Sequence, residues 1–248
     1  MQVLSFKNST VKYARVTGLM YLAIIFCGLF SGLFVREALV DFTNPALTAE
    51  NILNNLFLFK MGFVSDLIMI VCDIVVALTF YVLLKPASKN LALMAAFFRL
   101  VQASIIALNM LHHFEPVLML DGSIPFNANS SEQLFEMVLF SLKSHEYGYL
   151  ISGVFFGMSC LILSYLFKKS DLFPNWLAYL LAVGAMTYLG DCLVNFLFPE
   201  YAAFSEMMLL FTAVLAEFTI TLYLLFKSFK NHSENPSNRF QHQKYKYL

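Results

Sequence analysis

Five ionisable residues lie inside long apolar stretches of the chain, and their chemistry calls for an explanation. They are Asp66, Asp73, Arg99, Asp191 and Glu217. A charge at the centre of a bilayer costs at least about 2.5–3.5 kcal/mol, so such side chains must face a bundle interior or water. Four acids share these stretches with one arginine, so three acids lack a basic partner there. Those acids must be protonated, hydrated or bound to a cation, which indicates a site for a cation or a proton.

Polar side chains repeat at helical spacing around these charges, so they line one face of each predicted helix at about 100° per residue. The candidate intramembrane polar cluster consists of Asp66, Asp73, Arg99, Gln102, Asn109, Asp191, Asn195 and Glu217. The stripes together predict a polar interior that opens toward the outer side of the membrane. Candidates at this outer mouth are His112, His113, His145 and Glu146.

Asp73 and Arg99 are predicted to form an ion pair near the middle of the membrane. At about 1.5 Å per residue, they lie roughly 18 Å and 15 Å from the lysines that end their two apolar stretches. A tight hairpin joins the two stretches, so the side chains can meet. Such a pair can also serve only to hold helices together, and both interpretations stay open.

Imidazole and carboxylate groups suit zinc or iron, so a metal site is conceivable. Its ligands would come from His112, His113, His145, Glu146 and Asp191. The motifs H-E-x-x-H and H-x-x-E-H are absent, as are the Walker A loop, G-x-G-x-x-G and G-x-S-x-G. Histidines at a membrane interface are also more often solvated than ligating. We therefore expect no bound metal and no cofactor, and the sequence leans away from an enzyme.

The elements that position these residues are six apolar stretches, each long enough to cross a bilayer as a helix. Hydrophobic residues make up 59% of the 248-residue chain and charged residues only 13%. About 20 apolar helical residues span a hydrocarbon core of about 30 Å. The predicted spans are 17–35, 61–84, 90–111, 147–167, 174–198 and 202–226. We expect an all-α, six-transmembrane-helix bundle that contacts the lipid bilayer and no nucleic acid; the sequence defines no oligomeric state.

Two short helices are expected in the outer loops. Thr48 is a candidate N-cap for one of them, and Ser130 or Ser131 for the other. Amphipathic helices of this kind usually lie in the plane of the membrane interface. They would either close the bundle as a rim or gate a cavity.

The basic residues indicate the orientation, because cytoplasmic loops carry an excess of lysine and arginine. Twelve of them lie at the N-terminus, in the second and fourth connections and in the C-terminal tail. Only Arg36, Lys60 and Lys143 fall on the opposite side. We expect both termini in the cytoplasm, a six-span domain over residues 1–230, and a polar, disordered cytoplasmic tail over 231–248.

Several segments together carry a resemblance to a known family. They are residues 14–22, 62–73, 95–102, 145–150 and 190–195, with Phe98-Arg-Leu-Val-Gln102 the most specific stretch. In these segments the chain resembles an uncharacterised bacterial six-helix integral-membrane family, domain of unknown function 4386. The resemblance covers about residues 12–228. It implies six spans in a bacterial inner (plasma) membrane, and it implies no reaction.

Three functions fit these observations. The first is a protein that binds or carries a small solute, cation or proton through a polar intramembrane cavity. The second is a membrane-embedded enzyme that acts on a lipid-like substrate at the outer leaflet. The third is a non-catalytic assembly or signalling scaffold, for which the interior would be dry.

Overall fold

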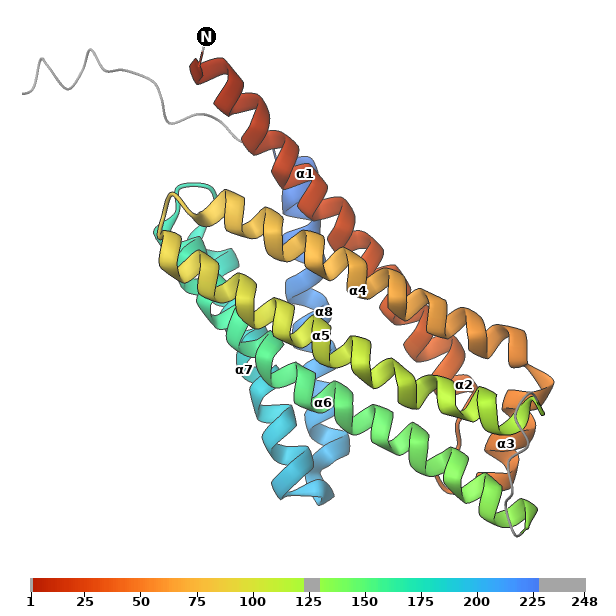
Figure 1. The fold of residues 1–248 in the computed structure, drawn as a ribbon. Helices are drawn as coiled ribbons and strands as arrows, with labels where there is room; N and C mark the ends of the chain where they lie inside the picture. Colours follow the sequence, from red (N-terminus) through yellow and green to blue (C-terminus); the bar gives the residue numbers. More distant parts are fainter. Residues whose placement is uncertain (1, 123–129, 228–248) are drawn as a thin grey trace, which may run out of the picture.

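The computed structural model describes residues 2–122 and 130–227, and the described residues form helices and their connections without a strand (Figure 1). The elements are α1 (Gln2–Leu29), the π-helix η1 (Phe30–Arg36), α2 (Glu37–Leu39), α3 (Pro45–Asn54), α4 (Leu56–Leu84), α5 (Lys89–Leu120), α6 (Ser131–Lys169), α7 (Asn175–Leu197), the 3₁₀ turn η2 (Pro199–Tyr201) and α8 (Ala202–Phe226). The predicted tail over 231–248 lies outside the described residues.

Within the described residues, six helical segments are long and apolar enough to cross a membrane, which confirms the predicted fold class. They are Thr10–Leu39, Leu56–Leu84, Lys89–Leu120, Ser131–Lys169, Asn175–Leu197 and Pro199–Phe226. Several extend well beyond the predicted spans. The 39 residues of α6 are about 58 Å long at 1.5 Å per residue, which exceeds a hydrocarbon core of about 30 Å.

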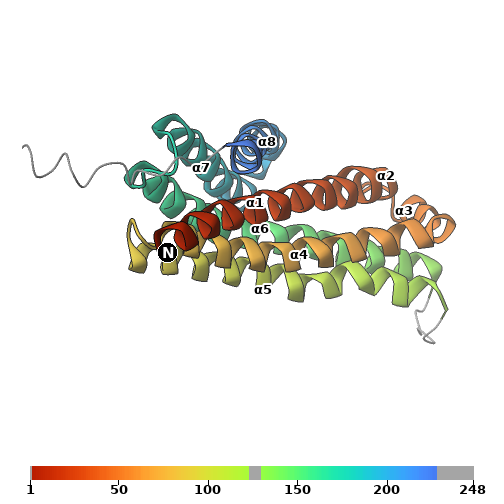
Figure 2. The ribbon, with the colours of Figure 1, turned by 90° about the horizontal axis from the view of Figure 1, so that it is seen from above.

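The six long helices form a closed ring in chain order. Each of α1, α4, α5, α6, α7 and α8 packs against the next, and α8 returns to α1. Figures 1 and 2 show α4, α5 and α6 running side by side, with α7 and α8 set away from α3. Six of the eight predicted polar cluster residues are buried within this ring, and two, Asn195 and Glu217, are partly exposed.

The two ends of the ring differ in composition. At one end, which we call the lysine end, the α4–α5 and α6–α7 turns carry Lys85, Lys89, Lys168 and Lys169. Near the start of α1, Thr10 and Tyr13 lie beside these two turns. The Tyr223 hydroxyl of α8 donates to the Leu172 carbonyl in the α6–α7 turn. At the opposite end, which we call the α3 end, α2 and α3 cover the bundle (Figure 1).

The apolar core has two parts. The larger part runs through all six long helices and includes Tyr21, Val76, Leu166 and Ile220. A smaller cluster lies at the α3 end, and consists of Val35, Leu39, Ile52, Phe59, Val117, Val138 and Leu142. It joins η1, α2 and α3 to the ends of α4, α5 and α6, and none of its residues belongs to α7 or α8.

The short helices differ in detail from the prediction. Asn44, not Thr48, caps α3, because its side chain accepts from the Leu47 amide at 3.0 Å. Thr48 instead bonds to the backbone of Asp41, at the preceding turn. In that turn Thr43 donates two hydrogen bonds to the Asp41 carboxylate, and these hold the pKa of that carboxyl below its ordinary value.

The second predicted short helix is not a separate element. Ser130 caps it as expected, accepting from the Gln133 amide at 3.2 Å. The helix then continues without a break into the fourth span, so it is the first part of α6. The reason is local: no proline or other helix breaker lies between Ser131 and the apolar stretch.

Candidate functional site

The predicted ion pair between Asp73 and Arg99 is confirmed, and it is the centre of a buried network. Arg99 donates from Nε and Nη2 to Asp73 Oδ1, at 2.9 and 2.5 Å. Its Nη1 donates to the Tyr21 hydroxyl at 2.8 Å, and Gln102 donates to Asp73 Oδ2 at 2.9 Å. The guanidinium also lies 4.9 Å from the ring centroids of Tyr21 and Phe156. Every charge in this network is therefore matched.

The network is closely packed. Arg99 is 1% exposed and Asp73 is 3% exposed. The small void beside Arg99 and Ser159 has essentially no volume for a water molecule. Ser159 donates to the Ala95 carbonyl at 2.9 Å, which ties α6 to α5 at this level. These contacts fit a structural role for the pair more closely than a role in a water-filled path.

Asp66 has a basic partner, which corrects the count of unpaired acids made from the sequence. Arg36 Nη1 lies 2.5 Å from Asp66 Oδ2 and 2.6 Å from the Ser31 hydroxyl. The sequence places Arg36 in the outer loop, but η1 continues the first span and carries its guanidinium inward. The same guanidinium lies 5.3 Å from the ring centroid of Tyr149.

Asp66, His113 and His145 come together from three different helices, α4, α5 and α6. One potential ligand atom from each side chain lies within 4.8 Å of the other two. Asp66 and His113 are fully buried, and His145 is 2% exposed. Nδ1 of His113 lies 3.9 Å from Asp66 Oδ2, and the two imidazole rings meet edge to face at 5.2 Å. We call these three residues the Asp–His–His centre.

The polar atoms of the Asp–His–His centre are largely unpaired. Among the described residues, Asp66 Oδ1, both ring nitrogens of His113 and His145 Nε2 have no well-aligned hydrogen bond. The His113 ring faces the Phe59 backbone, and the Tyr149 hydroxyl lies close to Asp66 and Arg36. A buried polar atom without a partner costs about 1–3 kcal/mol. Several such atoms converging on one point indicate a ligand that would satisfy them.

The surrounding helices hold the centre in place through close contacts. Asn109 on α5 donates to the His145 carbonyl at 2.7 Å. A side chain at position 148 would collide with the Asn109 amide, so Gly148 is needed for α5 and α6 to approach here. Phe59 covers the His113 ring, with 4.6 Å between ring centroids. Since Phe59 belongs to the smaller apolar cluster, that cluster separates the centre from the α3 end.

The remaining candidates from the sequence lie elsewhere. Asp191 accepts from Ser205 at 2.6 Å and from the Asn195 amide at 3.1 Å. Glu217 accepts from the Tyr188 hydroxyl at 2.9 Å. Among the described residues neither acid forms an ion pair, and neither joins the Asp–His–His centre.

The predicted outer-mouth set is divided by the structure. His112 pairs with Glu115 at 3.0 Å and Glu146 pairs with Lys143 at 2.7 Å, and all four side chains are more than one-third exposed. His113 and His145 instead point into the bundle toward Asp66. The difference follows from helical phase, because adjacent residues on a helix point about 100° apart.

The donor set fits a transition-metal ion. Two imidazole nitrogens and a carboxylate oxygen are ligands for zinc, and the same set is found for iron. Zinc bonds of about 2.0–2.2 Å place tetrahedral ligand atoms roughly 3.3–3.6 Å apart, so these side chains need only small rotations to bind. Arg36 donates to Asp66 Oδ2, which is also the oxygen 3.9 Å from His113 Nδ1, so Arg36 would be the outer partner of a ligating carboxylate.

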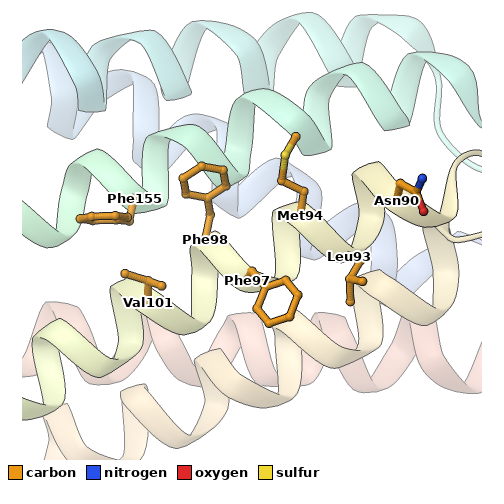
Figure 3. A pocket seen from close by; sticks show the side chains of 7 residues that line it. All are labelled: Asn90, Leu93, Met94, Phe97, Phe98, Val101 and Phe155. Atoms are coloured by element: carbon orange, nitrogen blue, oxygen red, sulfur yellow. The ribbon is translucent and has the colours of Figure 1, made fainter.

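A surface groove between α5 and α6 offers no comparable chemistry. It has a volume of about 350 Å³ and is lined by Asn90, Leu93, Met94, Phe97, Phe98, Val101 and Phe155 (Figure 3). Phe97 is 59% exposed on this face, which a membrane would cover with acyl chains. The seven residues that line the groove include no titratable side chain.

Arg36, Ser31, Tyr21 and Tyr149 were not among the candidates drawn from the sequence. Tyr149 follows His145 by four residues, so the two residues share one helical face. This spacing could have identified Tyr149 from the sequence. Arg36 lies one residue beyond the first predicted span, and only the continuation of the helix through η1 brings it to Asp66.

The fold and the site together define a six-span helical membrane protein with a buried Asp–His–His centre near one end. The chain belongs to the family described as Domain of unknown function (DUF4386), whose sequence model matches residues 16–228.

An uncharacterised protein of Archaeoglobus fulgidus is 29% identical over 161 residues, which cover 64% of this chain and 81% of that protein. No solved structure matches the chain. This relative is archaeal, so the bacterial origin implied by the resemblance stays a prediction.

Proposed function

We propose that this protein binds a first-row transition-metal ion at the Asp–His–His centre, with Zn²⁺ as the reference ion. The observation that carries the proposal is the convergence of unpaired, fully buried ligand atoms from α4, α5 and α6. The proposal revises the expectation of no bound metal. That expectation considered His113 and His145 but left out Asp66, the carboxylate that lies within reach of both.

The charges around the centre favour a particular fourth ligand. Arg36 already balances Asp66, so a divalent ion would bring positive charge that the protein does not neutralise. A bound metal would lower the pKa of a water ligand to about 7, and a hydroxide there would neutralise one of the two positive charges that the ion brings. Three protein ligands would leave a fourth position open, and the Tyr149 ring packs beside the centre, 5.0 Å from the His145 ring between centroids.

The residues around the centre favour a protein that binds the ion over one that transports it across the membrane. A path from the centre to the lysine end passes the Asp73–Arg99 network. There the side chains are closely packed, and the space beside Arg99 has no room for water. The binding function predicted from the sequence is therefore supported more strongly than transport.

We further propose the orientation with the lysine end in the cytoplasm of a prokaryotic cell, which places both termini inside by the positive-inside rule. The Asp–His–His centre then lies toward the outer face. Asp66 is 18 residues from the end of α4 at Leu84, about 27 Å along the helix at 1.5 Å per residue. The ion would sit near the outer boundary of the hydrocarbon core.

The alternative of an enzyme acting on a lipid-like substrate would use the same open position of the metal. It requires a route for the substrate to the centre. The smaller apolar cluster covers the centre at the α3 end, and its members Phe59 and Ile52 are fully buried. Because this cluster covers the centre, we favour metal binding over an enzymatic reaction.

The experiment is a calorimetric titration of Zn²⁺ into the full chain, purified in detergent without a histidine tag. We expect one site per chain. His113→Gln and His145→Gln should each weaken binding by more than the 10–100-fold that loss of an outer-shell partner costs. His112→Gln is the matched control, because this neighbouring histidine lies outside the centre, and the variant should bind like the wild type.

Asp66→Asn should weaken binding as well, but it also leaves Arg36 without its partner and lowers stability. The two histidine variants therefore carry the test. Equal Zn²⁺ affinity for wild type, His113→Gln and His145→Gln would refute the proposal.

A further inference from the structure

A cavity at the lysine end has no part in the proposed metal site. It has a volume of about 590 Å³, within the 300–1,000 Å³ that ligand pockets occupy. Three segments far apart in the sequence enclose it: the start of α1, the α4–α5 turn and the α6–α7 turn. The polar groups that line it belong to Thr10, Tyr13, Lys85, Lys169, Ser170 and Asp171.

The charge in this cavity is positive. Among the described residues, Lys85 and Lys169 line it together with one acid, Asp171, and neither lysine forms an ion pair. Lys89 and Lys168 stand next to the cavity on the same two turns. Ammonium groups beside the Tyr13 hydroxyl are suited to the phosphate of an anionic ligand.

The position of the cavity matches the headgroup level of a bilayer. Lys85 directly follows the last residue of α4, and Lys169 is the last residue of α6, so both mark where apolar helices end. The remaining wall is apolar and includes Val82, Leu83 and Leu172. A ligand that fits must therefore present a phosphate on one side and hydrocarbon on the other.

We propose that this cavity binds the headgroup of an anionic phospholipid. Basic pockets between transmembrane helices bind lipid headgroups of this kind, and lysine near an anionic surface contributes about fivefold in affinity per residue. The lipid-facing groove between α5 and α6 begins at Asn90, beside the same turn, and offers an apolar surface to acyl chains (Figure 3). The proposal is independent of the metal site.

The test uses the full chain in detergent, titrated with short-chain phosphatidylglycerol or phosphatidylcholine, with binding followed by native mass spectrometry. We expect the wild type to prefer phosphatidylglycerol. Lys85→Gln and Lys169→Gln should each weaken its binding about fivefold, and the double variant about 30-fold. Lys143→Gln removes a lysine toward the other end of α6 and should leave the affinity unchanged.

A parallel titration with inorganic phosphate distinguishes a lipid ligand from a free anion. We expect phosphate to bind far more weakly than the lipid, because it makes no contact with the apolar wall. Phosphate binding as tight as the lipid would overturn the lipid assignment. So would equal affinities of the wild type for the two lipids, or an unchanged affinity for phosphatidylglycerol in the double variant. If the double variant does not fold, the two single variants decide the question.

Discussion

Replacing Arg99 with methionine tests whether the Asp73–Arg99 pair holds the bundle together. The change removes the hydrogen bonds to Asp73 and Tyr21 and leaves the carboxylate with Gln102 alone. Asp73 is 3% exposed, so water cannot replace the lost partner. Removing one member of a buried ion pair costs about 3–5 kcal/mol. At about 2–4 °C per kcal/mol for a chain of this size, the melting temperature should fall by roughly 6–20 °C.

The assay is thermal unfolding of the purified chain in detergent, for Arg99→Met, Asp73→Leu and the double variant. Lys89→Met is the control, because it also replaces a basic side chain with methionine, at an exposed position on the same helix. The double variant should be more stable than the sum of the single effects predicts, since it leaves neither member of this ion pair without its partner. Strictly additive effects, or a melting temperature of Arg99→Met equal to that of Lys89→Met, would refute the structural role.

Two smaller changes test the local geometry by the same unfolding assay. Gly148→Ala places a methyl group against the Asn109 amide, and we expect a loss of about 1–3 kcal/mol together with weaker Zn²⁺ binding. A wild-type melting temperature would mean that α5 and α6 are not this close. Asn44→Ala removes the cap of α3 and should cost about 0.5–2 kcal/mol, whereas Asn44→Thr keeps a capping oxygen and should lose less. Equal stability of both Asn44 variants would argue against the cap.

The fold could be predicted from the sequence because the signal is strong and local. Each span is a long apolar stretch, and the turns at Pro86 and Pro174 fall where proline limits a helix. The ion pair of Asp73 and Arg99 was predictable for the same reason, since a tight hairpin fixes which levels of α4 and α5 face each other. Matching two opposite charges within one hairpin needs no knowledge of the rest of the ring.

The candidate site could be predicted only in part, because it depends on contacts between helices that are not neighbours in a hairpin. Arg36 reaches Asp66 only because a π-helix prolongs the first span past the predicted boundary. His113 and His145 were candidates from the sequence, but they were predicted to lie at the outer mouth of the bundle and not inside it. Whether they meet Asp66 depends on the rotation of α6 against α5, which the Gly148–Asn109 contact sets.

The extent of the helices was also underestimated, for a physical reason. Hydropathy predicts the part of a helix that lies in lipid. It does not predict how far the same helix continues beyond the membrane. The first part of α6 carries Glu132 and Glu136 and so falls below the hydropathy of a span. Its apolar side is nevertheless buried, because Val138 and Leu142 belong to the smaller cluster at the α3 end.

The most direct measurement of the central claim is X-ray absorption at the zinc edge, on the full chain loaded with one equivalent of Zn²⁺. The proposed centre predicts two imidazole nitrogens and additional oxygen ligands at about 2.0–2.2 Å. One imidazole contribution should be lost in His113→Gln and kept in His112→Gln. Sulfur ligands at about 2.3 Å, or a spectrum that is identical in His113→Gln and the wild type, would contradict a metal centre formed by Asp66, His113 and His145.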